Sequence, residues 1–191
     1  IRLYALHEGT LLYDAVGFAL NERLAGITGR KALVLMTDGV DNGSKSFSLR
    51  QNLRDAERGD VIIYTVQYNT LPQLPARLAT IGNVKAREHV RERMLKEYGV
   101  GSNYLQSLAA KTGGTLYKAD DLVDLPNAFG AITEELGRQY SLGYYPKSEV
   151  QPGEKRDIKV RTRTPNLMVR ARDSYTSAGA TRSQRSAVGG Q

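Results

Sequence analysis

The chain has 191 residues, of which 40% are hydrophobic and 25% charged, and it contains no cysteine. This length suits one domain with a hydrophobic core and a small appendage, whereas the lack of cysteine excludes disulfides and thiolate metal sites. The formal net charge of +7 lies largely toward the C-terminal end and favours anionic partners. No apolar run is long enough to span a bilayer.

The first predicted element is an amphipathic helix over residues 11–25, with Thr10 at or near its N-cap. Its apolar positions recur at helical spacing and are Leu12, Ala15, Val16, Ala19, Leu20 and Leu24. A strand follows over residues 31–37, because the uninterrupted apolar run there is typical of a strand buried on both faces of a parallel sheet.

A second strand is predicted over residues 61–68, which are rich in β-branched and aromatic side chains. Between the two strands, Ser48 is the predicted N-cap of a helix that ends near Arg58, with Leu49, Leu53 and Ala56 on its buried side. Strand, helix and strand in this order predict a right-handed parallel crossover and an α/β fold.

Residues 69–101 are predicted to be an insertion in this α/β domain. Pro72 and Pro75 indicate a loop, and residues 86–98 form a charged surface helix in this prediction. A separate short helix is expected to start at Ser102 or Asn103 and to end near Lys111.

The next elements complete a domain over residues 1–139. A short strand is predicted over 115–118, and a helix follows from Asp124 and Pro126, since proline suits a first helical turn. The core face of that helix is predicted to consist of Phe129, Ile132 and Leu136.

Residues 140–175 are predicted to be a β-rich extension, with strands over 141–145, 156–163 and 167–175. In the last two, apolar residues alternate with charged ones, as in antiparallel strands with one solvated face. Residues 176–191 have too few apolar side chains to form a core and are expected to be disordered.

The strongest candidate for a functional site is the end of the first strand, where Asp38, Gly39, Asp41 and Asn42 follow the apolar run. Ligands bind such sheets at the carboxyl ends of the strands. Asp38 is therefore a candidate ligand of a hard cation such as Mg²⁺. The alternative is an ordinary turn in which Asp38 caps the next element or is solvated.

Several segments together resemble the later two-thirds of a von Willebrand factor A (VWA) domain, with the match covering residues 9–175. They are GTLLYDAV at 9–16, ALVLMTDGVDN at 32–42 and VIIYTVQY at 61–68. The segments TGGTLYKADDLVDL, RQYSLGYYP and VRARDSY resemble the ending of the bacterial VWFA-related proteins of acidobacterial type. The resemblance implies a Rossmann-like three-layer sandwich with a metal-ion-dependent adhesion site (MIDAS).

In that family three loops hold the cation, and the resemblance assigns Thr10 to the second loop and Asp38 to the third. The first-loop motif Asp-x-Ser-x-Ser is absent; Asp41, Ser44 and Ser46 have a different spacing and lie in another loop. Because the chain starts just before Thr10, we expect the first strands to be missing. Mg²⁺, Mn²⁺ or Ca²⁺ should then bind weakly or not at all without them.

The neighbours of these two residues are expected to play supporting roles. Asp14 should support the fold or the surroundings of the metal, and Gly39, Asp41 and Asn42 should shape the turn. A protein partner is expected to complete the metal shell with an acidic side chain.

The resemblance implies a non-catalytic adhesion module that is secreted or periplasmic. A metal-dependent phosphohydrolase built on Asp38 and Asp41 is one alternative, although the sequence has no phosphate-binding loop, dinucleotide fingerprint or nucleophile elbow. A polyanion-binding module is the other. Its cationic residues would share one face of the C-terminal hairpin and are Lys159, Arg161, Arg163, Arg170 and Arg172.

Overall fold

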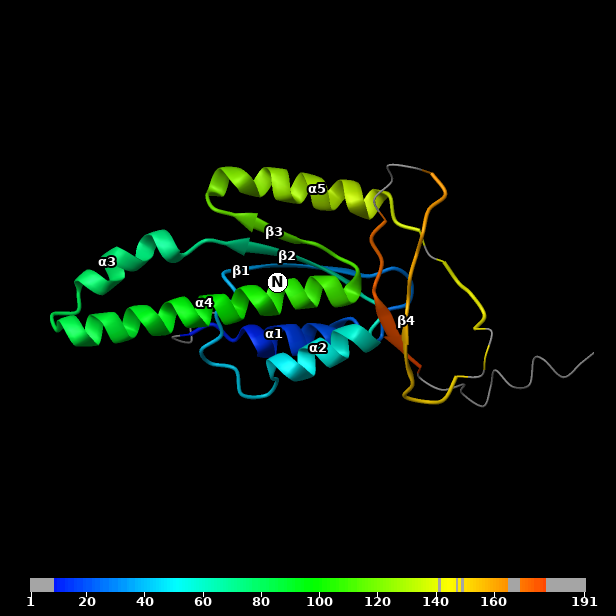
Figure 1. The fold of residues 1–191 in the computed structure, drawn as a ribbon, viewed down its shortest axis with the longest axis horizontal. Helices are drawn as coiled ribbons and strands as arrows, with labels where there is room; N and C mark the ends of the chain where they lie inside the picture. The colour runs from blue at the N-terminus through cyan, green and yellow to red at the C-terminus, as the bar shows by residue number, and fades with distance from the viewer. Residues whose placement is uncertain (1–8, 141, 147, 149, 165–168, 178–191) are drawn as a thin grey trace, which may run out of the picture.

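A parallel sheet of three strands forms the centre of the protein in the computed structural model, which describes residues 9–140, 142–146, 148, 150–164 and 169–177. The strands are β1 (Ala32–Thr37), β2 (Ile62–Tyr68) and β3 (Leu116–Ala119), in the order β1-β2-β3 (Figure 1). The predicted α/β class and parallel crossover are confirmed. The third strand lies one residue later than predicted.

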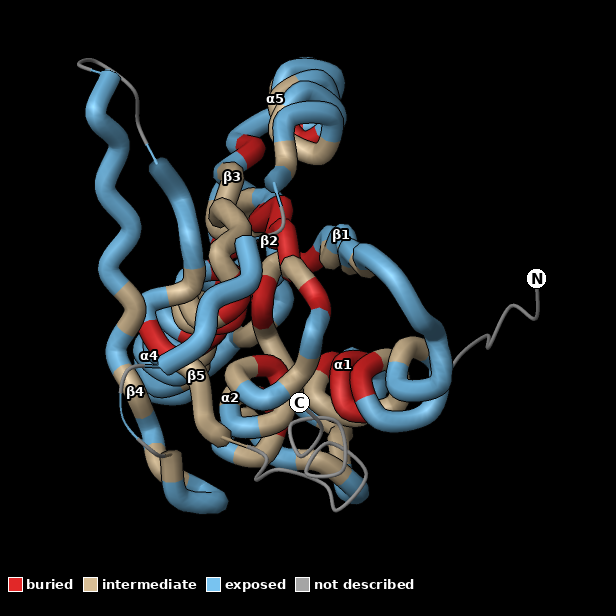
Figure 2. The backbone as a smooth tube through the Cα atoms, turned by 90° about the vertical axis from the view of Figure 1, so that its right-hand side faces the viewer, coloured by how far each residue is buried: buried red, intermediate tan, exposed pale blue. Residues whose placement is uncertain are grey.

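Helices cover the two faces of the sheet unequally. One face carries α1 (Leu12–Phe18), α2 (Leu49–Arg58) and α4 (Val84–Thr112), and the other carries α5 (Leu125–Gly137) (Figures 1 and 2). The central strand β2 contributes side chains to both cores, because successive side chains point to opposite faces of the sheet. Ile63 belongs to the core with α1, α2 and α4, and Tyr64 and Val66 belong to the core with α5.

Strand β1 is not buried on both faces, so that prediction was wrong. Leu33 and Leu35 pack against the core beneath α1, whereas the side chains on the other face, Val34 and Met36, are 39% and 44% exposed. The reason is that α5 packs on β2 and β3. The sheet therefore ends at β1 with an apolar face that no described helix covers (Figure 2).

The first two helices follow their sequence signals closely. After α1 the chain continues as one wide turn of π-helix, η1 (Ala19–Arg23), so the helical segment ends two residues before its predicted end. The predicted N-cap of α2 is confirmed, because the Ser48 hydroxyl accepts a 3.3 Å hydrogen bond from the backbone N–H of Gln51.

The segment predicted as an insertion forms a helical arm. The expected loop at the two prolines is instead a short 3₁₀ turn, η2 (Leu71–Gln73), followed by α3 (Leu74–Ala79). The two predicted helices after it are one helix of 29 residues, α4, which Asn83 caps. The first half of α4 is largely exposed, as expected for a charged surface helix, and the second half is buried against β2.

Helix α4 continues through Gly101 because this glycine contacts another glycine. A Cβ atom on Gly101 would lie 2.3 Å from the carbonyl oxygen of Gly39, which turns with a φ of +90° directly after Asp38. The expected start of a separate helix at Ser102 or Asn103 was therefore wrong, because α4 runs through both residues.

Helix α5 starts after a 3₁₀ turn, η3 (Leu122–Asp124), and presents a core face shifted by one residue from the prediction. Ala128 and Ile132 are buried and Leu136 packs beside them, whereas Phe129 is 41% exposed. Phe129 was thus wrongly assigned to the core.

The C-terminal extension contains less β-structure than predicted. Its described residues form two strands, β4 (Lys155–Asp157) and β5 (Ser174–Thr176), which pair antiparallel over three residues each, and residues 142–146 are not a strand. Ordered structure reaches Ser177, whose N–H donates to the Glu154 carbonyl, so the predicted tail begins too early. Ser141, residues 165–168 and the tail from 178 lie outside the described residues.

Candidate functional site

The candidate site lies where β1 and β2 end, at the carboxyl edge of the sheet. Asp38 follows the last residue of β1 and is half buried. Its Oδ1 accepts a 3.0 Å hydrogen bond from the N–H of Val40, and its Oδ2 accepts one of 3.3 Å from the Thr70 hydroxyl. Gln67, on β2, donates to the Asp38 backbone carbonyl at 2.9 Å.

These contacts orient Asp38 without using all of its oxygen lone pairs. A carboxylate has about four acceptor sites, and two described donors occupy two of them. No lysine or arginine forms a salt bridge with Asp38 among the described residues. The carboxylate can therefore accept a further donor or a cation.

The negative charge of Asp38 helps to raise the pKa of two tyrosine hydroxyls. Burial raises the pKa of Tyr68 above its ordinary value, and the negative charge of Asp38 raises it further. The pKa of Tyr98, on α4, is raised by burial and then by the charges of Asp120 and Asp38. Both hydroxyls stay neutral near pH 7, so they are hydrogen-bonding groups rather than bases at this edge.

Thr10 lies against the loop that starts at Asp38. Its backbone N–H donates to Asn42 Oδ1 at 2.6 Å, and the Asn42 N–H donates back to the Thr10 carbonyl at 3.2 Å. The structure thus brings Thr10 to the loop of Asp38. The N-cap position of α1 is Leu11, whose side chain makes no capping bond.

The first N–H groups of α1 are satisfied from the same loop, by residues far away in the sequence. Asp41 Oδ1 accepts from the Tyr13 N–H at 3.0 Å, and the Ser44 hydroxyl accepts from the Asp14 N–H at 2.9 Å. These contacts replace the local cap that the sequence suggested at Thr10. Asp41 thus caps α1 from a distance, and Asn42 holds Thr10 to the same loop.

Asp14, on α1, binds the backbone of the same loop. Its carboxylate accepts hydrogen bonds from three successive N–H groups, those of Lys45, Ser46 and Phe47, at 2.7–3.0 Å. These bonds, with that of Lys45 contributing most, lower the pKa of Asp14. Because its oxygens accept three backbone hydrogen bonds, Asp14 holds this loop against α1.

Oxygen ligands at this edge are few. Among the described residues, no three acidic or histidine side chains gather into a group that could hold a metal ion. His89 is exposed on α4. Any cation here would therefore rely on one carboxylate, on hydroxyl or water oxygens, and on ligands from another segment or molecule.

The five cationic residues of the polyanion hypothesis do not share one free face. Lys159, Arg161 and Arg163 are exposed. Arg170 instead forms an ion pair with Glu135, and Arg172 donates to the Gly59 carbonyl at 3.2 Å. Arg170 and Arg172 therefore attach the extension to the body. They do not form a common cationic surface with Lys159, Arg161 and Arg163.

Sequence analysis missed two carboxylates at the amino edge of the sheet. Glu57, on α2, accepts from Lys155 at 2.7 Å, Lys111 at 3.0 Å and Ser174 at 2.9 Å. The bond from Lys155 is the largest of several causes that lower its pKa to about 2. Because its partners come from three distant elements, no sequence spacing marks it.

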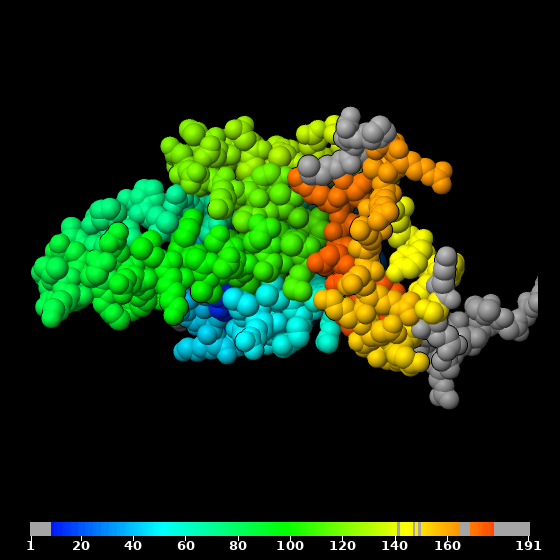
Figure 3. All heavy atoms as spheres, viewed as in Figure 1, coloured from blue at the N-terminus to red at the C-terminus, as the bar shows by residue number. Residues whose placement is uncertain are grey.

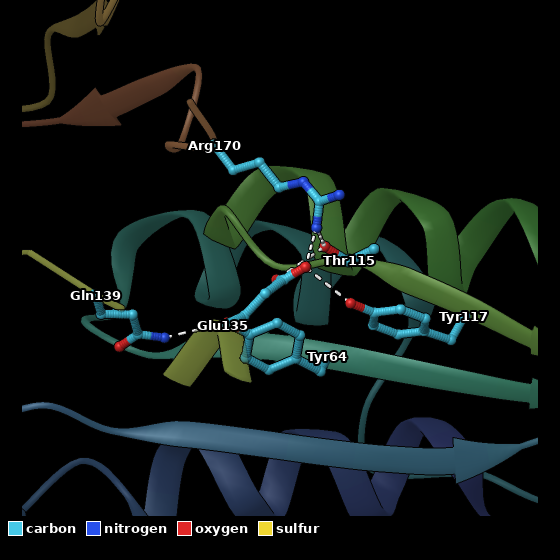
Figure 4. Close-up of polar contacts among 6 residues, drawn as sticks. All are labelled: Tyr64, Thr115, Tyr117, Glu135, Gln139 and Arg170. Carbon is cyan, nitrogen blue, oxygen red and sulfur yellow. Dashed lines mark hydrogen bonds and ion pairs between the residues drawn. The ribbon is translucent and has the colours of Figure 1, made fainter. Parts of the chain in front are cut away.

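Glu135, on α5, is the second of these carboxylates (Figure 4). It accepts from the hydroxyls of Tyr117 at 2.8 Å and Thr115 at 3.3 Å, and Arg170 approaches it from the extension. Nearby, Gln139 donates to the Tyr64 hydroxyl at 3.1 Å. Because Arg170 belongs to the extension and Glu135 to α5, this ion pair attaches the extension to the body.

Comparisons with protein-family models, with curated proteins and with solved structures find no match for this chain. Function is therefore inferred from its own sequence and geometry. In the described ranges, no helix has both the length and the apolar character required to cross a membrane.

Proposed function

We propose that this chain is part of a VWA-like protein-binding module in which Thr10 and Asp38 contribute to a divalent-cation site. The observation that carries the proposal is the reciprocal hydrogen bonding of Thr10 with Asn42, which lies four residues after Asp38. The backbone of Thr10 is thus held to the loop that begins at Asp38, at the carboxyl edge of a parallel sheet, where ligands of such folds bind.

The chemistry of the available donors fits a hard cation. Mg²⁺ prefers oxygen ligands and keeps several waters when few side chains reach it. Asp38 has unused acceptor sites and no cationic partner in the described structure, and no described group bonds to the Thr10 hydroxyl. With one carboxylate in its shell, the cation would stay electrophilic, so an acidic side chain of a partner protein can bind to it.

The free edge of β1 lies beside the candidate cation site. Among the described residues β1 pairs with β2 alone, so its other edge is open to a further strand. Such a strand, if parallel to β1, would end at the same edge as Asp38. We propose that polypeptide at this position supplies the remaining oxygen ligands, and that the module is exported, as the family resemblance implies.

A metal-dependent phosphohydrolase is less well supported. Such chemistry would need Asp38 and Asp41 to act together, but the Asp41 carboxylate accepts from the Tyr13 N–H and from Ser44. Its oxygens are occupied in holding α1 to the loop. Asp38 alone offers neither a second metal ligand nor a base.

Mn²⁺ binding tests the proposal, because bound Mn²⁺ is observed directly by electron paramagnetic resonance. We expect the chain to bind Mn²⁺ weakly and Asp38→Asn to abolish the binding. Asp120→Asn is the matched control, since Asp120 lies at the same edge but accepts from Asn69. Equal binding by Asp38→Asn and the parent chain, or equal loss in Asp38→Asn and Asp120→Asn, contradicts the proposal.

A further inference from the structure

The helical arm carries a groove that the candidate metal site does not use. The arm consists of η2, α3 and the first half of α4, and it projects past the carboxyl edge of the sheet (Figures 1 and 3). The groove between its helices has a volume of about 470 Å³, and its apolar lining includes Leu71, Leu74, Leu78 and Leu95. Leu95 is 41% exposed, so the apolar surface is open at one end.

The charged residues that line this groove are both arginines. Arg87 donates twice to the Ile81 carbonyl, at 2.8 and 3.2 Å, which holds its guanidinium at the end of the groove. Arg91 pairs with Glu88 at 3.2 Å, and both side chains are more than half exposed. A surface pair of this kind contributes little stability, so the Arg91 guanidinium can exchange Glu88 for another carboxylate.

The groove and the Asp38 loop are joined by one rigid element. Leu95 and Gly101 both belong to α4, and Gly101 packs directly against Gly39, the residue after Asp38. Six helical residues at 1.5 Å each place the groove end about 9 Å along the helix from that contact. One extended peptide can therefore span the two places.

We propose that the groove binds an acidic and apolar segment of the protein partner, with an apolar side chain against Leu74 and Leu78 and a carboxylate at Arg91. Charge complementarity selects this occupant, because the residues that line the groove are apolar except for Arg87 and Arg91. The proposal rests on the proposed function, in which the same partner reaches Asp38. It makes α4 the second contact of a two-point interface.

A fluorescent peptide in which leucine alternates with glutamate tests the groove by itself. We expect saturable binding in fluorescence anisotropy, about tenfold weaker binding by Arg91→Glu and near-normal binding by Arg91→Lys, because the pairing is electrostatic. Arg93→Glu is the control, since Arg93 belongs to the same helix but does not line the groove. A peptide with lysine in place of glutamate should not bind.

The outcomes separate this proposal from the cation site. Peptide binding that persists with a chelator and in Asp38→Asn supports the groove whatever the cation experiment shows. Absence of saturable binding, equal binding of the lysine peptide, or equal weakening by Arg91→Glu and Arg93→Glu overturns the groove proposal. Circular dichroism of each variant establishes that α4 is intact.

Discussion

The carboxylates at the two edges of the central sheet have different kinds of partner. At the amino edge, Glu57 and Glu135 bind cationic side chains from the C-terminal extension, and each carboxylate also accepts a hydrogen bond from a hydroxyl group. At the carboxyl edge, Asp14 and Asp41 bind backbone N–H groups, and Asp38 has no cationic partner among the described residues. A carboxylate that the fold itself neutralises serves the fold, whereas one left with unused acceptor sites is available to a ligand.

The largest effect should come from the glycine contact beneath the Asp38 loop. Gly101→Ala places a methyl group 2.3 Å from the Gly39 carbonyl oxygen, so we expect a loss of about 3 kcal/mol in the free energy of unfolding. Gly99→Ala, where the added Cβ meets no atom within 4 Å, should stabilise the same helix by about 1 kcal/mol. Urea denaturation of both variants measures the contrast, and equal effects would contradict the packing argument.

At the amino edge, Glu57→Gln removes the charge that holds Lys155 and Lys111. We expect a loss of about 2 kcal/mol at pH 7, less than the full pKa shift implies because Lys155 is half exposed. The folded pKa of about 2 lies below the ordinary 4.5. The stabilisation is therefore complete above pH 4.5 and is lost as the pH falls toward 2.

Urea denaturation at pH 7 and pH 3 measures this pH dependence. The gap between Glu57→Gln and the parent chain should narrow at the lower pH. Glu134→Gln, which removes an exposed pair with Arg138, is the control and should have little effect at either pH. A gap that stays constant with pH would show that Glu57 acts through packing alone.

At the carboxyl edge, Asp14→Ala should loosen one loop rather than the whole domain. The variant loses the acceptor of three N–H groups, so hydrogen exchange at Lys45, Ser46 and Phe47 should accelerate while core amides stay protected. Because the pKa of Asp14 is lowered from 3.8, the parent loop keeps its protection above that pH and loses it on acidification. Glu22→Ala, an exposed change nearby, should leave these amides unchanged.

The smallest effect is expected on the outer face of β1. Met36→Gln changes a side chain that is 44% exposed, so the free energy of unfolding of this chain should move by about 0.5 kcal/mol or less. Leu35→Ala, on the adjacent and core-facing position, should cost about 2 kcal/mol or more. Thermal denaturation compares the two. A large effect of Met36→Gln would mean that this face is covered in the folded chain.

Local signals predicted the individual elements well. Apolar periodicity located α1 and α2, apolar and β-branched runs located β1 and β2, and Ser48 marked the start of α2, because these features depend on neighbouring residues. The same local features did not predict that α4 continues through Gly101, which packs against Gly39. They also placed Phe129 in the core, although the core face of α5 is shifted by one residue and this side chain is 41% exposed.

For the candidate site, too, the sequence pointed to some residues and gave no signal for others. The sequence pointed to Asp38 through its position after an apolar strand, and it assigned supporting roles to Asp14, Asp41 and Asn42, whose side chains all accept backbone hydrogen bonds in the structure. It gave no signal for Glu57 or Glu135, and it placed Arg170 and Arg172 on a free surface. These four depend on partners that the fold brings together from distant segments.

The sequence by itself thus determined the fold class, the strands and the place of Asp38, because periodicity and turn chemistry act over a few residues. Only the tertiary structure decided which charges are neutralised, which face of β1 stays uncovered and how α4 joins the arm to the Asp38 loop. Those outcomes depend on packing between segments tens of residues apart, and a contact such as Gly39 against Gly101 has no counterpart in local sequence.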